Sequence, residues 1–322
     1  MIVITGAAGF IGSVLAGRLN ALGYTNLVLV DDFTSRPDKA RNWEGKVCDT
    51  KIGREEVFAY IAHRPAEIEA VFHIGAKTDT TLFDKGVFDT LNVRYSQRLW
   101  QLCAQEQIPF IYASSAATYG AGEHGYADDE GLITALQPLN PYGQSKQDFD
   151  VWALAQTEAP YYWRGFKFFN VYGPNEYHKG RMASVIFHAF NQIRMEGRLR
   201  LFRSHNPSYT DGGQMRDFIY VFDLVEVLIH SFEQRTTSGI FNLGTGKART
   251  FLALGTQVFR SLGLEPQIEF IDTPADIRDK YQYFTEANMD KLRLAGYDKA
   301  FTTLEDGIDQ YVQAYLLPGK VA

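Results

Sequence analysis

Cysteine is scarce in this sequence, with only Cys48 and Cys103 among 322 residues. Two isolated thiols provide no disulfide framework and no C-x-x-C pair for zinc or redox chemistry, so we expect a reducing compartment and no metal site. No apolar run approaches the roughly 18–20 residues that cross a bilayer. The start at Met1 has no basic leader and predicts a strand rather than a signal peptide. We therefore expect a cytoplasmic protein with no membrane partner.

Positive charge is also limited, because the sequence has 32 lysines and arginines against 38 acidic residues, which gives a formal net charge of −6. Proteins that bind nucleic acid along its backbone need a positive surface, so we expect no nucleic-acid partner. A small anionic ligand would need a local basic cluster. The apolar content of 45% is ordinary for a globular protein. At this length the chain suits one large core with a second, smaller unit.

The first half of the chain alternates short β-branched runs with amphipathic stretches, which predicts an α/β protein with a doubly wound parallel sheet. Expected strands cover residues 2–5, 27–31, 70–73, 109–113 and 162–169. Expected helices cover residues 11–22, 55–63, 87–106, 142–157, 183–196, 222–233, 251–262, 286–294 and 304–316. The pattern becomes less regular after Asn170, where we expect a smaller α/β unit that binds substrate.

A glycine-rich turn follows the first strand and opens the first helix, with glycines at Gly6, Gly9 and Gly12. Glycines at this place allow a tight turn and let backbone N–H groups approach a pyrophosphate. The motif predicts a Rossmann-type dinucleotide-binding domain, which we expect to span residues 1–170 plus about 217–243. Residues 171–216 and 244–322 would then form the substrate-binding domain.

The residues after the second strand leave the choice of cofactor open. Asp31 stands where an acid usually accepts hydrogen bonds from the adenosine ribose, which favours NAD. Arg36, Lys39 and Arg41 follow closely, and cations there would neutralise the additional 2′-phosphate of NADP. The expected cofactor-binding residues are Gly6, Gly9, Phe10, Ile11, Gly12, Asp31, Asp32, Lys39, Arg54, Ile74, Gly75, Ala76, Lys77, Thr78, Asn92, Tyr142, Lys146 and Val171.

A tyrosine and a lysine, Tyr142 and Lys146, are spaced i and i+4 and so lie on one face of a helix. A phenol with a pKa near 10 shuttles protons near neutrality only if a cation stabilises the phenolate, and we expect Lys146 to do so. Roughly 27 residues upstream, an apolar strand ends in Ser114 and Ser115. Ser115 is the better candidate to hold a substrate oxygen near Tyr142. We expect Ser114 to cap or pack the end of the strand.

These motifs in this order resemble the extended short-chain dehydrogenase/reductases that act on nucleotide sugars. Two longer blocks, at residues 112–120 and 169–185, narrow the resemblance to the ADP-L-glycero-D-manno-heptose 6-epimerase family. The specific part is His178-Lys179-Gly180-Arg181-Met182-Ala183-Ser184. Further matching blocks lie at residues 239–246, 281–285 and 295–299, so that the resemblance covers nearly the whole chain.

The resemblance implies an NADP-dependent isomerase of lipopolysaccharide core biosynthesis that assembles into a homo-oligomer, by family a pentamer. Its substrate would be ADP-D-glycero-D-manno-heptose, whose C6 carbinol carries no acidic hydrogen. Inversion would therefore proceed through a transient 6-keto sugar, with hydride leaving and returning through the cofactor. By the same resemblance, Tyr142 is one acid/base and Lys179 a second. The alternative for Lys179 is a cation that only binds phosphate.

The family also implies a set of residues around the nucleotide sugar, with Arg216 on the diphosphate. The expected substrate-binding residues are Ser115, Asn170, Lys179, Arg181, His188, Leu201, Phe202, Arg203, Ser204, Arg216 and Tyr281. Three features depart from the family: Thr78 where serine is common, Leu82 where an acid often stands, and an insertion at residues 204–214.

Two other functions remain open. The first is another enzyme on this scaffold, such as a UDP-hexose 4-epimerase, against which the His178-Lys179 block argues. A dehydratase is disfavoured, because Ala116-Ala117 stand where dehydratases usually carry an Asp-Glu pair. The second is a non-catalytic, NADP-sensing protein of the same fold. Such proteins typically lose the tyrosine or the lysine, and this chain has both.

Overall fold

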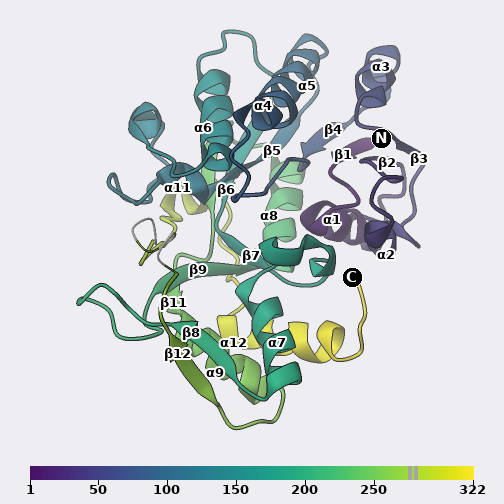
Figure 1. Ribbon diagram of the computed structural model, residues 1–322. Coiled ribbons are helices and arrows are strands. Elements are labelled where there is room, and N and C mark those ends of the chain that lie inside the picture. The colour runs from purple at the N-terminus through teal and green to yellow at the C-terminus, as the bar shows by residue number, and fades with distance from the viewer. Residues whose placement is uncertain (275–277, 279–281) are drawn as a thin grey trace.

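The computed structural model describes residues 1–274, 278 and 282–322, and its centre is a seven-stranded sheet whose strands all run parallel (Figure 1). The strand order is β10-β6-β5-β4-β1-β2-β3. Its strands are β1 (Ile2–Thr5), β2 (Leu27–Val30), β3 (Thr50–Ile52), β4 (Ala70–His73), β5 (Phe110–Ser115), β6 (Trp163–Phe168) and β10 (Gly239–Leu243). The sequence-based prediction of a doubly wound parallel sheet is confirmed.

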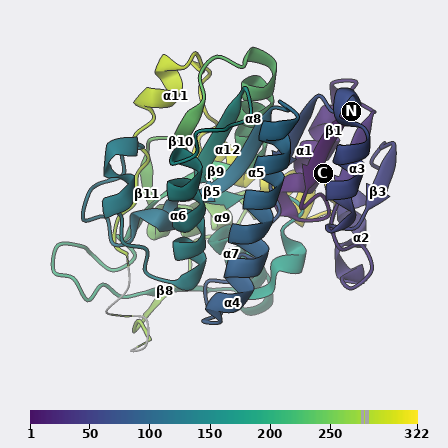
Figure 2. The same ribbon diagram turned by 90° about the horizontal axis from the view of Figure 1, so that it is seen from above.

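Helices cover both faces of this sheet, as the view from above shows (Figure 2). The α-helices are α1 (Phe10–Ala21), α2 (Ala40–Trp43), α3 (Glu56–His63), α4 (Lys85–Phe88), α5 (Tyr95–Gln105), α6 (Pro141–Leu154), α7 (Val185–Glu196), α8 (Val221–Gln234), α9 (Phe251–Ser261), α11 (Asp290–Leu294) and α12 (Leu304–Tyr311). In the described part of the chain, no helix combines the length and the apolar character that crossing a membrane requires.

Shorter helical turns of other types connect these elements. The 3-10 turns are Pro37–Lys39, Pro65–Glu67, Ala116–Tyr119, Glu130–Ala135 and Tyr177–Met182, and the π-helical turns are Asp89–Arg94 and Val312–Leu316.

The central strands β1, β2, β4 and β5 are buried on both faces because both faces are covered. In β1, Val3 packs with residues of α3, α5 and α6, whereas its neighbours Ile2 and Ile4 pack on the opposite face with α1 and α8. Successive side chains of a strand point to opposite faces, so an unbroken apolar run can fill two cores. This explains why the sequence pattern identified the central strands.

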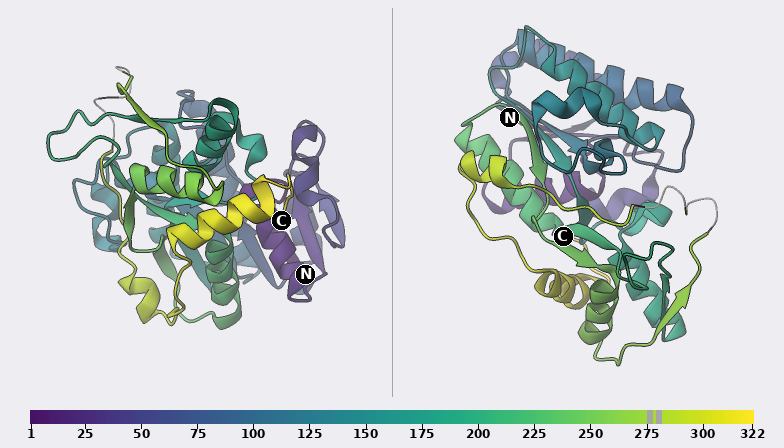
Figure 3. Two further views of the ribbon diagram at one scale, coloured as in Figure 1. Left: turned by 90° about the horizontal axis from the view of Figure 1, so that it is seen from below. Right: turned by 90° about the vertical axis from the view of Figure 1, so that its left-hand side faces the viewer.

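A second group of elements lies below the sheet in Figure 1 and is seen from another side in Figure 3. It contains a three-stranded sheet of order β11-β9-β7, made of β7 (Asn170–Tyr172), β9 (Met215–Tyr220) and β11 (Ala248–Thr250). A two-stranded sheet pairs β8 (Leu199–Phe202) with β12 (Ile268–Ile271). Between β9 and β11 the chain returns to the main sheet through α8 and β10.

The least accurate helix prediction is the one over residues 286–294, since α11 begins only at Asp290. The residues before Asp290 instead form contacts with the main body of the protein. The backbone N–H of Ala287 donates to a carboxylate oxygen of buried Asp217 at 3.1 Å. That long-range contact holds the chain out of a helix, and the local sequence gives no sign of it.

Candidate active site

A cleft of about 760 Å³ opens where β1, β2 and β4 end, at the carboxyl edge of the parallel sheet. Ligands of doubly wound proteins bind at this edge. The residues that line the cleft are Thr5, Gly6, Gly9, Phe10, Ile11, Gly12, Val30, Asp31, Asp32, Ser35, Arg36, Lys39, Arg54, Ile74, Gly75, Ala76, Lys77, Thr78, Asp79, Leu91, Tyr95, His178, Lys179, Gly180 and Met182. Most of the predicted cofactor-binding residues are among them.

The glycine turn forms the floor of the cleft, and two of its positions admit no side chain. Gly6 has φ +69°, and a Cβ there would lie 2.6 Å from Cα of Gly75. A Cβ on Gly12 would lie 2.2 Å from the carbonyl oxygen of Gly6. The turn ends at Gly9, the N-cap of α1, where no side chain caps the helix. The first backbone N–H groups of α1 therefore remain for an anion such as a pyrophosphate.

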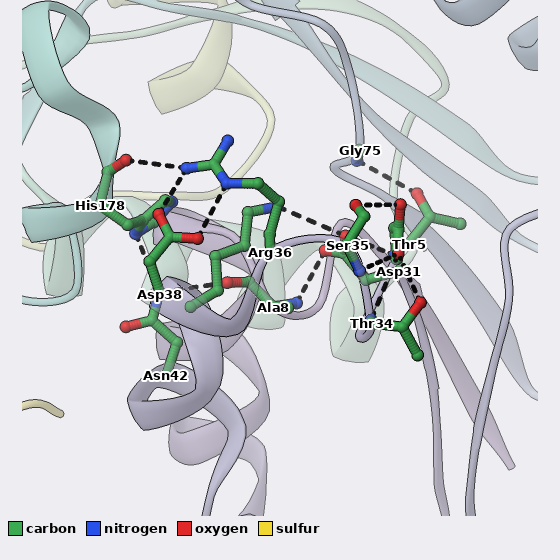
Figure 4. Close-up of polar contacts among 12 residues, drawn as sticks. Thr5, Ala8, Asp31, Thr34, Ser35, Arg36, Asp38, Asn42, Gly75 and His178 are labelled. Atoms are coloured by element: carbon green, nitrogen blue, oxygen red, sulfur yellow. Dashed lines mark hydrogen bonds and ion pairs between the residues drawn. The ribbon is translucent and has the colours of Figure 1, made fainter.

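Two aspartates after β2, Asp31 and Asp32, line the next wall of the cleft, and Figure 4 shows the contacts of Asp31. The Asp31 carboxylate accepts hydrogen bonds from the backbone N–H of Ala8 at 2.9 Å and of Asp32 at 2.7 Å. Lys39 Nζ lies 3.5 Å from the same carboxylate. Hydrogen bonds from Ser35 lower the pKa of Asp32, which keeps this carboxylate charged. Arg36 and Ser35 also line the cleft, beside Lys39.

The turn after β4 is held by a buried histidine. His73 Nδ1 lies 2.7 Å from Thr5 Oγ1, and its Nε2 lies 2.8 Å from Ser96 Oγ. Burial lowers the pKa of His73 to about 3, and the charge of Lys146 adds to the shift, so the ring is neutral at pH 7. Thr5 also accepts the backbone N–H of Gly75 at 3.1 Å. His73 therefore fixes the two turns relative to each other.

Asn92 lies behind the cleft and makes no direct contribution to its lining among the described residues. Its side chain accepts from the backbone N–H of Lys77 at 2.8 Å and donates to Ser145 Oγ at 2.9 Å. Ser145 stands next to Lys146 on α6. Asn92 thus connects the turn after β4 to the helix that carries Tyr142.

Ser115, Tyr142 and Lys146 form a cluster beside the cleft, at the end of β5 and the start of α6. Asn140 caps α6 by accepting the backbone N–H of Gly143 at 2.8 Å, which places Tyr142 in the first turn. Ser115 and Tyr142 are joined by a side-chain hydrogen bond. Lys146 is buried, and its Nζ donates to the carbonyl oxygen of Ala113 at 2.8 Å. The structure thus brings these three predicted residues together.

The pKa of Tyr142 departs from the sequence-based expectation. Burial raises it, the hydrogen bond with Ser115 opposes that shift, and the negative charge of Asp150 adds to it. Lys146 Nζ donates to the Ala113 carbonyl, so stabilisation of the phenolate by Lys146 stays a prediction. Burial also lowers the pKa of Lys146 to about 8, against the opposite effect of Asp150.

Lys179 lines the cleft and lies on the 3-10 turn Tyr177–Met182. Its Nζ lies 5.2 Å from the ring centroid of Phe10. Burial lowers the pKa of Lys179, and the neighbouring charge of Glu176 opposes the shift. A lysine whose pKa is lowered toward neutrality can exchange protons, which fits the expectation of an acid/base.

Three neighbours of Lys179 that were not predicted as site residues also line the cleft: His178, Gly180 and Met182. They belong to the block that carries the resemblance, which is the signal that could have identified them.

The predicted substrate-binding residues other than Lys179 lie outside the lining of this cleft, among the described residues. Arg216 on β9 is buried and donates to the carbonyl oxygens of Met215, at 2.8 Å, and Gln282. Leu201 on β8 is buried in the hydrophobic core, and Phe202 follows it. Asn170, Arg181, His188 and Arg203 are exposed, whereas Val171 and Ser204 are half-buried. Tyr281 lies outside the described residues.

Within residues 1–274, 278 and 282–322, no three histidine, cysteine or acidic side chains gather closely enough to hold a metal ion.

Comparison with known proteins gives concordant results. Residues 2–244 match the model of the NAD dependent epimerase/dehydratase family. An ADP-L-glycero-D-manno-heptose-6-epimerase of Nitratidesulfovibrio vulgaris is 49% identical over 98% of this chain and 98% of its own length. The crystal structure of the Helicobacter pylori ADP-L-glycero-D-manno-heptose-6-epimerase has a TM-score of 0.79 at 26% identity, covering 97% of this chain and 95% of that one. MoeE5 in complex with UDP-glucose and NAD has a TM-score of 0.76 at 26% identity, with 97% of each chain covered.

Proposed function

The chain belongs to the ADP-L-glycero-D-manno-heptose-6-epimerases of the NAD dependent epimerase/dehydratase family, and we propose that it inverts C6 of the heptose in ADP-D-glycero-D-manno-heptose through a 6-keto sugar. The product, ADP-L-glycero-D-manno-heptose, serves lipopolysaccharide core biosynthesis. The observation that carries the proposal is the 49% identity to an enzyme of this name along 98% of both chains.

The direct test of this function is to incubate the purified protein with ADP-D-glycero-D-manno-heptose, an ADP-hexose and a UDP-hexose and to resolve the epimers. We expect epimer formation from the ADP-heptose alone. Turnover of the UDP-hexose instead would identify a UDP-hexose 4-epimerase. No turnover of any of the three by a correctly folded protein would favour a cofactor-sensing role.

The glycine turn fits a nicotinamide dinucleotide, since neighbouring backbone excludes side chains at Gly6 and Gly12 and the first N–H groups of α1 remain for a pyrophosphate. Bound there, the cofactor would accept a hydride from C6 and return it to the opposite face of the ketone. We propose NADP as this cofactor. Both Asp31 oxygens already accept backbone N–H groups, and Lys39 pairs with Asp31, so the acid is engaged within the protein. Arg36 and Lys39 supply the cations that a 2′-phosphate requires.

We expect the purified protein to retain NADP(H). Denaturing the protein and identifying the released nucleotide by chromatography measures this. Release of NAD alone, or failure of the protein to bind either nucleotide, would contradict the proposed cofactor without affecting the choice of sugar substrate.

In the proposed mechanism, Tyr142 holds and moves the proton of the C6 oxygen in one orientation of the sugar, and Ser115 orients the same oxygen by hydrogen bonding. Lys146 assists through its charge, because an ammonium favours the phenolate form. Lys179 serves the second orientation, in which the other face of the ketone meets the cofactor. The hydrogen bond between Ser115 and Tyr142 and the lowered pKa of Lys179 support these roles.

We further propose that the elements outside the main sheet form the substrate domain, covering residues 171–216 and 244–322, with Arg216 on the diphosphate. Arg216 is a buried residue of β9, which belongs to the second group of elements. Asn170, Arg181, His188, Leu201, Phe202, Arg203, Ser204 and Tyr281 complete the proposed substrate set, and the resemblance alone supports them. The resemblance also supports a cytoplasmic homo-oligomer, by family a pentamer.

A further inference from the structure

The cleft contains a contact between two segments far apart in the sequence, between Arg36 and the turn that carries Lys179. Arg36 Nε and Nη2 donate to the Asp38 carboxylate at 2.9 and 2.6 Å. Nη2 also donates to the backbone carbonyl oxygen of His178 at 3.2 Å (Figure 4). His178 is the residue directly before Lys179, and both line the cleft. One guanidinium therefore joins the adenosine side of the cleft to the lysine side.

Asn42 provides a second connection to the same turn. Its side-chain amide is buried and donates to the carbonyl oxygens of Ala8 at 3.1 Å and Asn175 at 3.2 Å. It also lies 3.3 Å from His178 Nδ1. Burial lowers the pKa of His178 to about 4, so the neutral ring can accept this hydrogen bond at pH 7. Asn42 thus fixes one side of the turn to the glycine loop, and Arg36 holds the other.

The turn has little internal support of its own. Tyr177–Met182 is a 3-10 stretch interrupted at Gly180, which has φ 53° and ψ −127°. The Lys179 backbone N–H donates to the Glu176 carbonyl at 3.0 Å, and Gly180 is exposed. A short 3-10 segment of this kind depends on neighbouring side chains for its position. Arg36 and Asn42 therefore contribute to the position of Lys179, together with Arg41, whose guanidinium lies 5.1 Å from the Tyr177 ring centroid.

We propose that Arg36 is a positioning residue that couples occupancy of the adenosine site to the placement of Lys179. This inference rests on the proposed NADP cofactor and on the proposed role of Lys179. Within the described residues, Arg36 Nη1 makes no hydrogen bond, and the side chain is 48% exposed in the cleft. An adenosine phosphate can engage Nη1 while Nη2 keeps the His178 carbonyl. Binding would then stiffen the arginine and, through it, the turn.

Hydrogen exchange of the backbone amides at residues 177–182 tests this coupling, with adenosine 2′,5′-bisphosphate as the probe and the protein stripped of nucleotide. This probe lacks the nicotinamide half of the cofactor. In the wild-type protein we expect saturating probe to slow exchange in this segment by roughly fivefold or more, the lower end of coupling between two sites. In Arg36→Lys, we expect saturating probe to slow exchange by less than about twofold, because lysine keeps the charge but cannot bridge two acceptors as a planar fork does.

Lys39→Met is the matched control, since Lys39 lines the same cleft and pairs with Asp31 instead of the turn. It should weaken probe binding but retain the wild-type slowing once saturated. The coupling would be overturned if saturating probe slowed exchange of the turn in Arg36→Lys as strongly as in wild type. It would also be overturned if the probe did not slow exchange of the turn in the wild-type protein. Thermal melting of each variant verifies folding.

The dissociation constants from the same titrations separate this inference from the choice of cofactor. If adenosine 2′,5′-bisphosphate binds no more tightly than 5′-AMP, then the NADP proposal fails. The exchange experiment is then repeated with saturating 5′-AMP in place of the bisphosphate. Slower exchange in wild type than in Arg36→Lys supports the coupling, and equal slowing in the two proteins overturns it.

Discussion

Tyr142→Phe and Lys179→Met are each expected to lower epimerase turnover by about 10²–10⁴-fold while changing nucleotide-sugar affinity little, because each removes a positioned acid/base. The two residues stand on different elements. Tyr142 stands at the start of α6 with its hydroxyl hydrogen-bonded to Ser115, and Lys179 stands on the turn Tyr177–Met182 and lines the cleft. In the proposed mechanism, a carbonyl that must be reduced on either face meets one of them in each orientation.

The paired measurement for each variant is the turnover number together with the dissociation constant of the ADP-heptose. Two surface replacements serve as controls: Tyr161→Phe, at a tyrosine 53% exposed, and Lys299→Met, at an exposed lysine. Both controls should behave as wild type. If Lys179→Met turns over normally once saturated, then Lys179 only binds the substrate, and Tyr142 must serve both faces of the ketone.

Asp150→Ala is expected to destabilise the protein by about 3–5 kcal/mol, because it leaves the buried Lys167 ammonium without its counter-ion. The Asp150 carboxylate lies 2.8 Å from Lys167 Nζ, and the two side chains are 0% and 2% exposed. The same carboxylate accepts hydrogen bonds from Ser114 at 2.6 Å and from Tyr112 at 3.0 Å. Its removal therefore leaves several buried polar groups unsatisfied at the end of β5.

Urea unfolding measures this loss as a lower midpoint at unchanged slope. Asp290→Ala is the control, since Asp290 forms an exposed pair with Arg293 at 3.3 Å. Exposed pairs contribute about 0–1 kcal/mol, so this variant should stay close to wild type. Equal, small effects of the two substitutions would mean that water enters the site around Lys167. Asp150→Ala should also reduce turnover, because Ser114 adjoins Ser115.

Sequence reasoning succeeded where local patterns determine the structure. Strands β1 and β4 are fully buried four-residue runs that begin with three apolar residues, and their predicted bounds were correct. The glycine turn was recognisable because its spacing follows from steric contacts within the turn. The strand β3, with sequence Thr-Lys-Ile and no fully buried residue, was missed because it lies at the sheet edge and lacks the apolar signal.

Features that depend on distant contacts could not be predicted from the sequence. The hydrogen bond from Arg36 to His178 joins residues 142 positions apart. Similarly, the pKa of Tyr142 rises because tertiary packing buries the phenol and places it near the charge of Asp150, and the same packing turns Lys146 toward Ala113. The i, i+4 spacing places both residues on one face of a helix but does not determine where the ammonium points. Such directions require the folded chain.

Strand β10 completes the main sheet, although the chain reaches it only after passing through β7, β8 and β9. On the ribosome, β6 ends at Phe168 long before β10 begins at Gly239, and the residues between them take seconds to synthesise at ~5–20 residues per second. During that interval the unpaired edge of β6 is open to wrong partners, as any exposed edge strand is. A nascent chain that stalls here would be prone to aggregate, which makes this stretch a natural place for a chaperone to act.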